Sequence, residues 1–191
     1  MAPHPDLADC ADSALVVVDL QGRLSAAMPA DEAERVAKAT LRLLKAADCL
    51  GVPVLATEQY PQGLGPTQAE IAAAWPSATS VFAKTGFSCC RAPGFVEALA
   101  ESGRRQVLLV GQEAHVCVLQ SAYDLLQLGY RVQVLGDAVC SRNPEHKASA
   151  LRRLQSRQVI VTNHESVLFE WLGDAAHPQF KAVSALLREK I

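Results

Sequence analysis

Long apolar runs, paired cysteine spacings and an excess of one charge are all missing from this sequence. No apolar run approaches the roughly 20 residues that a membrane-spanning helix needs, so we expect no such helix. Acidic residues number 20 and basic residues 18, which leaves a formal net charge of −2 and no electrostatic reason to expect nucleic acid or an anionic membrane as a partner. Residues 1–13 contain no basic flank and no apolar core, so we expect no secretory leader and a cytoplasmic location.

Motifs that bind cofactors are missing too. The sequence contains neither GxGxxG nor GxxxxGK[ST], which argues against two common nucleotide-binding loops. Its six cysteines have no CxxC or zinc-finger spacing, so we expect free thiols and no cofactor. The cysteines are Cys10, Cys49, Cys89, Cys90, Cys117 and Cys140.

The apolar content of the chain is enough for one core. Of its 191 residues, 50% are apolar and 20% are charged, which is the composition of an ordinary globular protein. A chain of this length suits one well-buried domain better than two. No internal repeat, low-complexity tract or linker divides it, so we expect a single domain over 1–191.

Short apolar runs alternate with longer amphipathic segments along the chain, as in proteins built from β-α-β units. Strands are expected at 14–21, 53–59, 80–87, 105–112, 131–138 and 158–163. Helices are expected at 31–51, 93–102, 115–128 and 145–155, with two more after 163. Right-handed crossovers would cover both faces of the sheet. The expected fold class is a three-layer α/β/α domain with a six-stranded, mainly parallel sheet.

Three reactive side chains stand near expected strand ends, where ligands bind in open parallel sheets. Asp19 ends an apolar run and could simply be capped or ion-paired, Lys84 could extend to solvent, and Cys117 could be a small core residue. A thiol in the first turn of a helix, with a lysine nearby, would instead have a lowered pKa. Together the acid, the base and the thiol indicate a nucleophile with an activator and a charge partner.

Five motifs follow one another from the first expected strand to the last helix. They are VVVDLQ, TEQYPQGLGPT, VFAKTGFS, GQEAHVCVLQSAYDLLQLGYRVQVLGDAVCSR and VIVTNHESVLFEWLGDAAHPQFK. In order and spacing they resemble the isochorismatase-like cysteine hydrolase superfamily, with the strongest likeness to the isochorismatase domain-containing proteins. The combination is specific for the superfamily and weak for the substrate.

The resemblance implies an Asp–Lys–Cys catalytic triad, which falls on Asp19, Lys84 and Cys117. In that chemistry the aspartate takes the thiol proton, the lysine stabilises the charge, and the sulfur attacks an amide-type carbonyl to form a thioester that water hydrolyses. The family holds the oxyanion with backbone N–H groups of the nucleophile and of the residue four positions before it, here Glu113. It also has a cis peptide bond at the position of Gln112–Glu113.

Three departures from the family pattern bear on activity and substrate. Ala114 stands where relatives commonly carry threonine, and Cys140 where they usually carry serine. Nicotinamidase-type relatives have an Asp-x-His metal site after the second strand, where this chain offers only Glu58. One carboxylate is too few for a tight site, so we expect no metal. Hydrolysis of a vinyl ether does not need the thiol, so the expected reaction is cleavage of a C–N bond.

Residues around the expected nucleophile are candidates for lining a pocket for a small-molecule substrate. They are Gln21, Glu58, Gln59, Tyr60 and His115. His115 is two residues from the cysteine, and side chains at i and i+2 of a helix do not face each other, so we expect no Cys–His dyad. Arg142 and Asn143 could equally line the pocket or cap the next helix.

Two other classes of function stay open. The chain could keep a hydrolase fold as an interaction scaffold, because fold alone never proves activity. A thiol-redox protein would need a second cysteine within reach of Cys117, with Cys140 as the candidate, whereas the adjacent Cys89 and Cys90 are expected to be two plain thiols. Relatives are usually dimers or larger, so we expect a homo-oligomer.

Overall fold

The computed structural model describes residues 4–188, in which strands and helices alternate. The strands are β1 (Ser13–Val18), β2 (Val54–Gln59), β3 (Ser80–Lys84), β4 (Gln106–Gln112), β5 (Arg131–Cys140) and β6 (Ile160–Thr162). The longer helices are α2 (Ala30–Leu50), α5 (Phe95–Glu101), α6 (Leu119–Gln127), α7 (Pro144–Gln155), α8 (His164–Leu172) and α9 (Phe180–Leu186). Shorter helical turns are α1 (Gly22–Ser25), α3 (Pro61–Leu64), α4 (Ala69–Ala72), a 3-10 turn (Cys89–Arg91) and a π-helical turn (Ala114–Val118).

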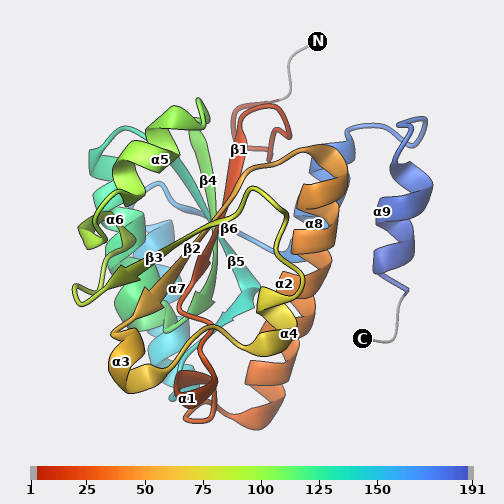
Figure 1. The fold of residues 1–191 in the computed structure, drawn as a ribbon. Coiled ribbons are helices and arrows are strands. Elements are labelled where there is room, and N and C mark those ends of the chain that lie inside the picture. The colour runs from red at the N-terminus through yellow and green to blue at the C-terminus, as the bar shows by residue number, and fades with distance from the viewer. Residues whose placement is uncertain (1–3, 189–191) are drawn as a thin grey trace.

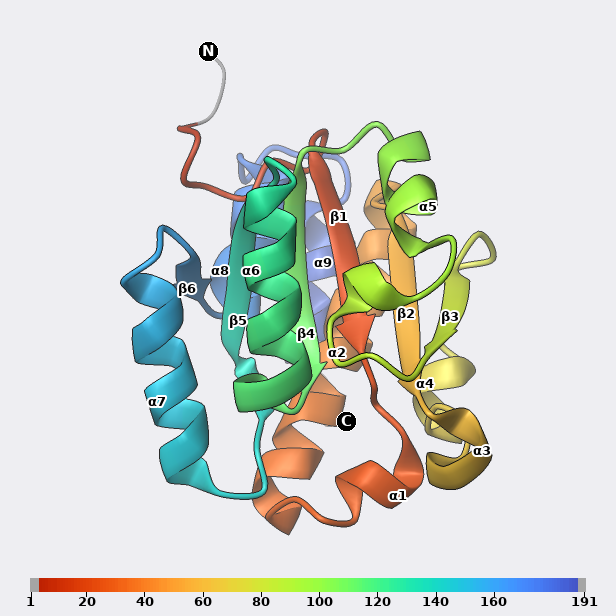
Figure 2. The same ribbon diagram turned by 90° about the vertical axis from the view of Figure 1, so that its left-hand side faces the viewer.

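The strands form one six-stranded sheet in the order β3-β2-β1-β4-β5-β6, and neighbouring strands are parallel. Helices α5, α6 and α7 cover one face and α2 and α8 the other, with α9 packed on the outside of α2 and α8, as Figure 1 and Figure 2 show from two sides. The order reverses at β1, because β2 and β3 extend the sheet to one side of it and β4, β5 and β6 to the other. The expected three-layer α/β/α fold is confirmed.

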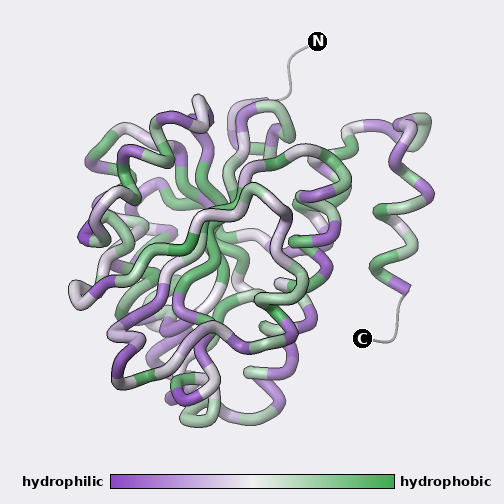
Figure 3. Tube along the Cα trace, in the orientation of Figure 1, coloured by the Kyte–Doolittle hydropathy of each residue, from purple (hydrophilic) through white to green (hydrophobic). Residues whose placement is uncertain are grey.

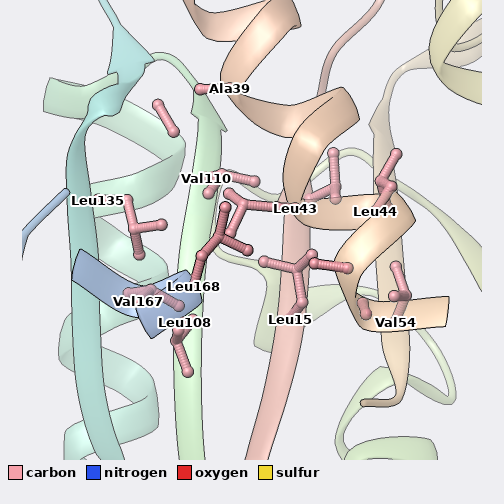
Figure 4. Packing of buried hydrophobic residues seen from close by; sticks show 14 of the residues in the cluster. Leu15, Ala39, Leu43, Leu44, Val54, Leu108, Val110, Leu135, Val167 and Leu168 are labelled. Carbon is pink, nitrogen blue, oxygen red and sulfur yellow. The ribbon is translucent and has the colours of Figure 1, made fainter. Parts of the chain in front are cut away.

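Alternate side chains of the central strands feed two hydrophobic layers. Leu15 and Val17 of β1 join the cluster that contains α2 and α8, whereas Val16 and Val18 join the cluster on the opposite face. Figure 4 shows the first layer, in which leucines of α2 and α8 pack over β1 and β4. Figure 3 shows the result along the chain, with hydrophobic strands at the centre and hydrophilic segments outside. Burial on both faces explains why the strands read as continuous apolar runs.

Several elements differ from the sequence-based expectation. β1 ends at Val18 rather than at 21, and β6 is shorter than expected at both ends. β3 ends at Lys84 rather than at 87, because the following residues turn back and the carbonyl of Phe87 accepts a 3.0 Å hydrogen bond from Lys84 Nζ. The helix expected from His115 begins instead with the wider turn Ala114–Val118 before α6. Within residues 4–188 no helix is long and apolar enough to cross a membrane.

The carboxyl ends of the parallel strands meet at one edge of the sheet. This edge lies next to α1 and α3, at the bottom of Figures 1 and 2, and the N-terminal segment lies at the opposite edge. The central neighbours β1 and β4 pair from Ser13–Gln106 to Val18–Gly111. The residues that directly follow them are therefore brought together at the carboxyl edge, where sheets of this kind bind ligands.

Candidate active site

Asp19 directly follows β1 at the carboxyl edge of the sheet. Its backbone adopts a left-handed conformation with a φ of 52°, which is uncommon for a residue other than glycine, and its side chain is fully buried. Thr57 Oγ1 donates a 2.8 Å hydrogen bond to Asp19 Oδ1, and Lys84 Nζ lies 2.7 Å from Asp19 Oδ2. Both carboxylate oxygens thus have a partner, as a buried charge requires.

The ammonium group of Lys84 is also buried, and three acceptors hold it in place. Besides Asp19, it donates to Gln59 Oε1 at 2.7 Å and to the carbonyl oxygen of Phe87 at 3.0 Å. An ammonium has three N–H donors, so each has an acceptor. The alternative in which Lys84 extends to solvent is therefore wrong.

Cys117 lies in the π-helical turn between β4 and α6. The carbonyl of Glu113 accepts hydrogen bonds from the N–H groups of Val116 at 3.1 Å and Val118 at 3.2 Å. The second bond spans five residues, which makes the turn wider than an α-helical one, and such turns are frequent at functional sites. Cys117 is only 5% exposed, and its sulfur lies 4.0 Å from Gln59 Oε1.

The thiol of Cys117 keeps its proton at neutral pH. Burial, the largest cause, and the negative charge of Asp19 raise the pKa of Cys117 far above its usual range, and the Lys84 charge opposes this rise without reversing it. Lys84 lowers the thiol pKa, as expected from the sequence, but burial and the Asp19 charge outweigh this effect, so the net shift of the pKa is upward rather than downward. A protonated thiol needs a base when it attacks, and the Asp19 carboxylate, whose charge acts on the thiol, can serve as one.

The close approach of β4 to β1 requires a glycine at position 111. Gly111 has a φ of +112°, and a Cβ atom there would lie 2.0 Å from the carbonyl oxygen of Val18. The next residue, Gln112, donates from Nε2 to the carbonyl oxygen of Asp19 at 3.1 Å. The Gln112–Glu113 peptide bond is cis, as the family resemblance implies. The sequence analysis does not predict the close approach at Gly111 or the hydrogen bond of the Gln112 side chain, although a glycine that interrupts a buried strand often marks a close backbone approach.

A comparison with protein families agrees with this arrangement. The family model described as the Isochorismatase domain matches residues 13–166, a range that contains Asp19, Lys84 and Cys117. The chain belongs to the isochorismatase family. The recognition made from the sequence motifs is confirmed, and the fold is that of the hydrolases of this family.

Several named relatives and solved structures are similar to the chain. Isochorismatase domain-containing protein 2 of Bos taurus is 42% identical over 149 residues, which is 78% of this chain and 71% of that protein. Isochorismatase domain-containing protein 1 of Danio rerio is 43% identical over 148 residues, 77% of this chain but 51% of that protein, so the chain spans about half the length of that relative. A solved structure of MAR1 ribonuclease from Caenorhabditis elegans has a TM-score of 0.89 at 36% identity and covers 95% of this chain and 92% of its own.

A more distant structure shares the fold alone. The YcaC gene product of Escherichia coli, described as an octameric hydrolase of unknown specificity, has a TM-score of 0.87 at 24% identity and covers 98% of this chain and 91% of its own. Three-layer architecture is therefore kept across the isochorismatase family and its neighbours while the sequences diverge.

Two glutamines expected to line the pocket of this isochorismatase domain make hydrogen bonds to the protein itself. Gln21 donates from Nε2 to the carbonyl of Gln59 at 2.9 Å and accepts at Oε1 from its N–H at 2.7 Å. Gln59 accepts from Lys84 at Oε1 and donates from Nε2 to the carbonyl of Thr85 at 2.8 Å. Gln21 therefore holds the backbone of Gln59, whose side chain holds Lys84 next to Cys117. A contact of either glutamine with substrate stays a prediction.

Glu58 and Tyr60, which flank Gln59, have different environments. Glu58 Oε1 accepts hydrogen bonds from the backbone N–H and the hydroxyl of Thr67 at 2.7 and 2.8 Å, so this carboxylate fastens the loop after β2. Tyr60 has a φ of 37° and is 53% exposed, so its ring is accessible.

Nowhere in the described range 4–188 do three or more His, Cys, Asp or Glu side chains gather as metal ligands.

His115 and Ala114 lie in the same turn as Cys117 but have other neighbours. His115 Nδ1 and Ser141 Oγ are 2.9 Å apart, and the rings of His115 and His146 have centroids 4.9 Å apart. Burial, the largest cause, lowers the pKa of His115. Ala114, where relatives carry threonine, is fully buried in the hydrophobic cluster beside α6. Whether His115 lines a pocket stays a prediction.

All six cysteines are free, and three of them, Cys89, Cys117 and Cys140, are buried. Cys140 belongs to the cluster on the α2 face, whereas Cys117 belongs to the cluster on the other face. The candidate redox partner is thus on the wrong side of the sheet. The thiol that does share the neighbourhood of the site is Cys89, whose sulfur lies 3.6 Å from Thr57 Oγ1. Burial and then the charge of Asp19 raise the pKa of Cys89 to about 11, so it too is a neutral thiol.

A groove flanks the Lys84 side of the site. Its volume is about 570 Å³, and Phe87, Gln120 and Tyr123 are among its lining residues. Phe87 is 52% exposed, and its carbonyl is one of the three acceptors of Lys84. Gln120 is close to one helical turn after Cys117. Asp19, Lys84 and Cys117 are not among the residues that line it, so the groove adjoins the site through Phe87 and Gln120 without containing the acid, the base or the thiol.

Proposed function

We propose that this isochorismatase-family protein is a cysteine hydrolase that cleaves a C–N bond of amide type in a small molecule. Asp19, Lys84 and Cys117 are its catalytic residues, and the intermediate is a thioester on Cys117. The observation that carries the proposal is the fully buried Asp19–Lys84 pair, 2.7 Å apart, next to a thiol whose pKa is raised by burial and by the Asp19 charge. A neutral nucleophile beside a fixed carboxylate is an arrangement for general-base catalysis.

Acylation begins when the Cys117 sulfur attacks the carbonyl carbon. The thiol proton moves to the Asp19 carboxylate, and the carbonyl electron pair moves to its oxygen. The N–H groups of Glu113 and Cys117 bind this oxyanion, and losing one donor of this kind typically costs about 2.7–4 kcal/mol of barrier. When the oxyanion collapses, the C–N bond breaks and Asp19 returns the proton to the leaving nitrogen. Lys84 stays charged throughout and offsets the charge of the carboxylate.

Deacylation uses the same groups with water as the nucleophile. The Asp19 carboxylate takes a proton from a water molecule as its oxygen attacks the thioester carbon. The C–S bond then breaks, a carboxylic acid leaves, and the sulfur recovers its proton from Asp19. These reaction steps need no metal or organic cofactor, since every proton and electron pair is accounted for by the side chains, the substrate and water.

The test is a screen of small primary and secondary amides for release of ammonia or amine. The wild-type protein and Cys117→Ala are compared, and the reaction is quenched in acid so that an acylated Cys117 can be found by intact-mass and peptide mass spectrometry. We expect turnover and a trapped acyl adduct in the wild type only. Turnover that survives Cys117→Ala would contradict the covalent mechanism, and an inert thiol in every condition would favour the scaffold alternative.

A ribonuclease is the second candidate, because the Caenorhabditis elegans neighbour at 36% identity is named as one. Two properties of this chain weigh against it. Its formal net charge is −2, and the Lys84 ammonium is buried with three acceptors, so it offers no exposed charge for a phosphate. Incubation of labelled single-stranded RNA with the wild type and with Asp19→Asn decides between the two, since cleavage lost in the variant would favour the ribonuclease.

The assembly and location of the protein are further proposals. Homo-oligomerisation is implied by the family resemblance, and the Escherichia coli neighbour is described as octameric. Light scattering on the purified protein measures the mass directly. A cytoplasmic location and the absence of membrane and nucleic-acid partners also stay predictions, which imaging of a tagged chain and pull-downs would check.

A further inference from the structure

The carboxylate of Glu113 is buried between β4 and the turn that carries Cys117, and it has an unusual set of contacts. Its side chain is 5% exposed, and its hydrogen-bond donors come from one residue, Arg142. The Arg142 backbone N–H donates to Oε2 at 2.9 Å, Nη2 donates to Oε1 at 2.7 Å, and Nε lies 3.1 Å from each oxygen. A planar guanidinium that grips a carboxylate with two nitrogens fixes orientation as well as distance.

This contact joins the ends of two neighbouring strands. Glu113 follows β4 and Arg142 follows β5, and the register of the two strands pairs Gln112 with Cys140 just before them. The backbone of Glu113 is held as well, because its carbonyl accepts the N–H groups of the turn that carries Cys117. Glu113 is thus fixed through its carbonyl and through its carboxylate. Little freedom is left for its own N–H group.

The ionised state that the contact needs is present at neutral pH. Burial by itself would raise the pKa of the Glu113 carboxyl, but the hydrogen bonds from Arg142 outweigh burial and lower it. The same interaction raises the pKa of Arg142. The pair is therefore a carboxylate and a guanidinium whenever the protein is folded near pH 7.

We propose that Arg142 is a positioning residue for catalysis, which locks Glu113 so that its backbone N–H is aimed at the oxyanion. The inference rests on the proposed hydrolase function, and it gives the side chain of Glu113 a task that does not involve substrate contact. Donors aimed in advance at the developing charge are worth far more than mobile ones. Misplacement by about 1 Å can cost on the order of 10²-fold in rate.

Two electrophiles distinguish an effect of Arg142 on the oxyanion site from a general effect on the reactivity of the Cys117 thiol. Iodoacetamide alkylates Cys117 by displacement of iodide and develops no oxyanion. The ester p-nitrophenyl acetate acylates the same sulfur through a tetrahedral oxyanion and releases p-nitrophenolate. The ratio of the acylation rate to the alkylation rate at Cys117, measured at one pH by site-resolved mass spectrometry, therefore reports the oxyanion site alone.

We expect Arg142→Gln to lower this ratio by about ten- to a hundredfold, with the alkylation rate close to that of the wild type. Arg142→Lys should recover little, because an ammonium cannot reproduce the two-pronged contact. The matched control is Arg131→Gln at the first residue of β5, the strand that Arg142 follows. Arg131 pairs with Asp12 and donates to the carbonyl of Pro5 at 3.0 Å, at the opposite edge of the sheet, so its loss should leave the ratio unchanged.

A double-mutant cycle completes the test. Because Glu113→Gln and Arg142→Gln break the same contact, the double variant should lose no more of the ratio than the worse single variant. A ratio that stays at the wild-type value in Arg142→Gln would overturn the proposal, as would equal slowing of both electrophiles. A wild type that iodoacetamide labels but p-nitrophenyl acetate never acylates would overturn the proposed hydrolase, and the positioning task with it.

Discussion

The two edges of the sheet both bury polar side chains, but of different kinds. At the amino edge the buried groups are neutral, namely Ser13, Gln106 and Gln133. At the carboxyl edge Asp19 and Lys84 are charged, and the Cys117 thiol is titratable. A neutral amide can stay buried with an incomplete set of hydrogen bonds, as Gln133 does, whose Oε1 has no hydrogen-bond partner among residues 4–188, whereas a buried charge is costly without an ionic partner.

The amino edge uses its polar groups to hold the N-terminal segment. Gln106 Oε1 accepts from the N–H of Asp9 at 2.8 Å and from the Ser13 hydroxyl at 2.9 Å, while its Nε2 donates to the carbonyl of Leu7 at 2.9 Å. Gln133 Nε2 donates to the carbonyl of Asp6 at 3.1 Å. These bonds join the start of the sheet to the chain that crosses it, and they serve stability.

The carboxyl edge keeps one group loosely bound. Asp19 and Lys84 have close partners, yet the Cys117 sulfur is 4.0 Å from Gln59 Oε1. Thiols make weak hydrogen bonds in any case. The comparison teaches that burial of polar groups alone does not identify a site. A site is indicated where saturated charges surround one reactive group that is not saturated.

The largest expected effect is on turnover in Asp19→Asn. Without the base, hydrolysis of an amide substrate should fall by roughly 10²–10⁴-fold. Alkylation should respond in the opposite sense, because the Asp19 charge that raises the thiol pKa is gone and Lys84 remains. Site-resolved labelling with iodoacetamide should therefore shift to lower pH. A shift to higher pH, or unchanged turnover, would mean that Asp19 does not act on the thiol.

Next in size is the loss of stability in Lys84→Met. Removing one partner of a fully buried ion pair leaves the other charge uncompensated, which costs about 3–5 kcal/mol of unfolding free energy. The same change should move alkylation of Cys117 to higher pH, since the Lys84 charge lowers the thiol pKa. Urea denaturation and labelling measure the two effects.

Lys38→Met is the control for that variant. Lys38 pairs with Glu34 on the exposed side of α2, where the two side chains are 37% and 65% exposed. A surface pair of this type is worth at most about 1 kcal/mol. Equal losses in the two lysine variants would show that the carboxyl edge does not treat its charges differently from the surface.

A smaller effect is expected for Gln59→Leu, which removes one acceptor of Lys84. We expect a loss of about 1–3 kcal/mol of stability together with a fall in kcat, because Lys84 is no longer held beside Cys117. Steady-state kinetics should show the change in kcat rather than in KM alone. A change confined to KM would instead assign Gln59 to substrate binding, as the sequence suggested.

The smallest expected effect on activity is that of Gln106→Leu at the amino edge. It removes three hydrogen bonds and should cost a similar 1–3 kcal/mol, roughly, which lowers Tm by about 2–4 °C per kcal/mol in a domain of this size. The kcat should be unchanged. If kcat falls with Tm in this variant too, the division of tasks between the two edges is wrong.

The order of elements and the sharing of one edge by Asp19, Lys84 and Cys117 could be predicted from the sequence. Alternating strands and helices allow few topologies, since crossovers are right-handed and parallel strands end at the same edge. Residues that follow these strands are therefore neighbours at the carboxyl edge, regardless of which side chains they carry. For the same reason the six strands were placed correctly to within a few residues, and the main error was the π-helical turn at Ala114–Val118.

Only the tertiary structure decided the charge state of Cys117 and the tasks of its neighbours. The thiol pKa depends on how deeply Cys117 is buried and on the charges of Asp19 and Lys84 beside it. Both are set by residues that are distant from Cys117 in the chain. In the same way, Gln59 reaches Lys84, and Arg142 rather than solvent holds Glu113, because of strand register and turn geometry. A sequence determines which reactive groups arrive at an edge, and three-dimensional contacts determine their protonation and orientation.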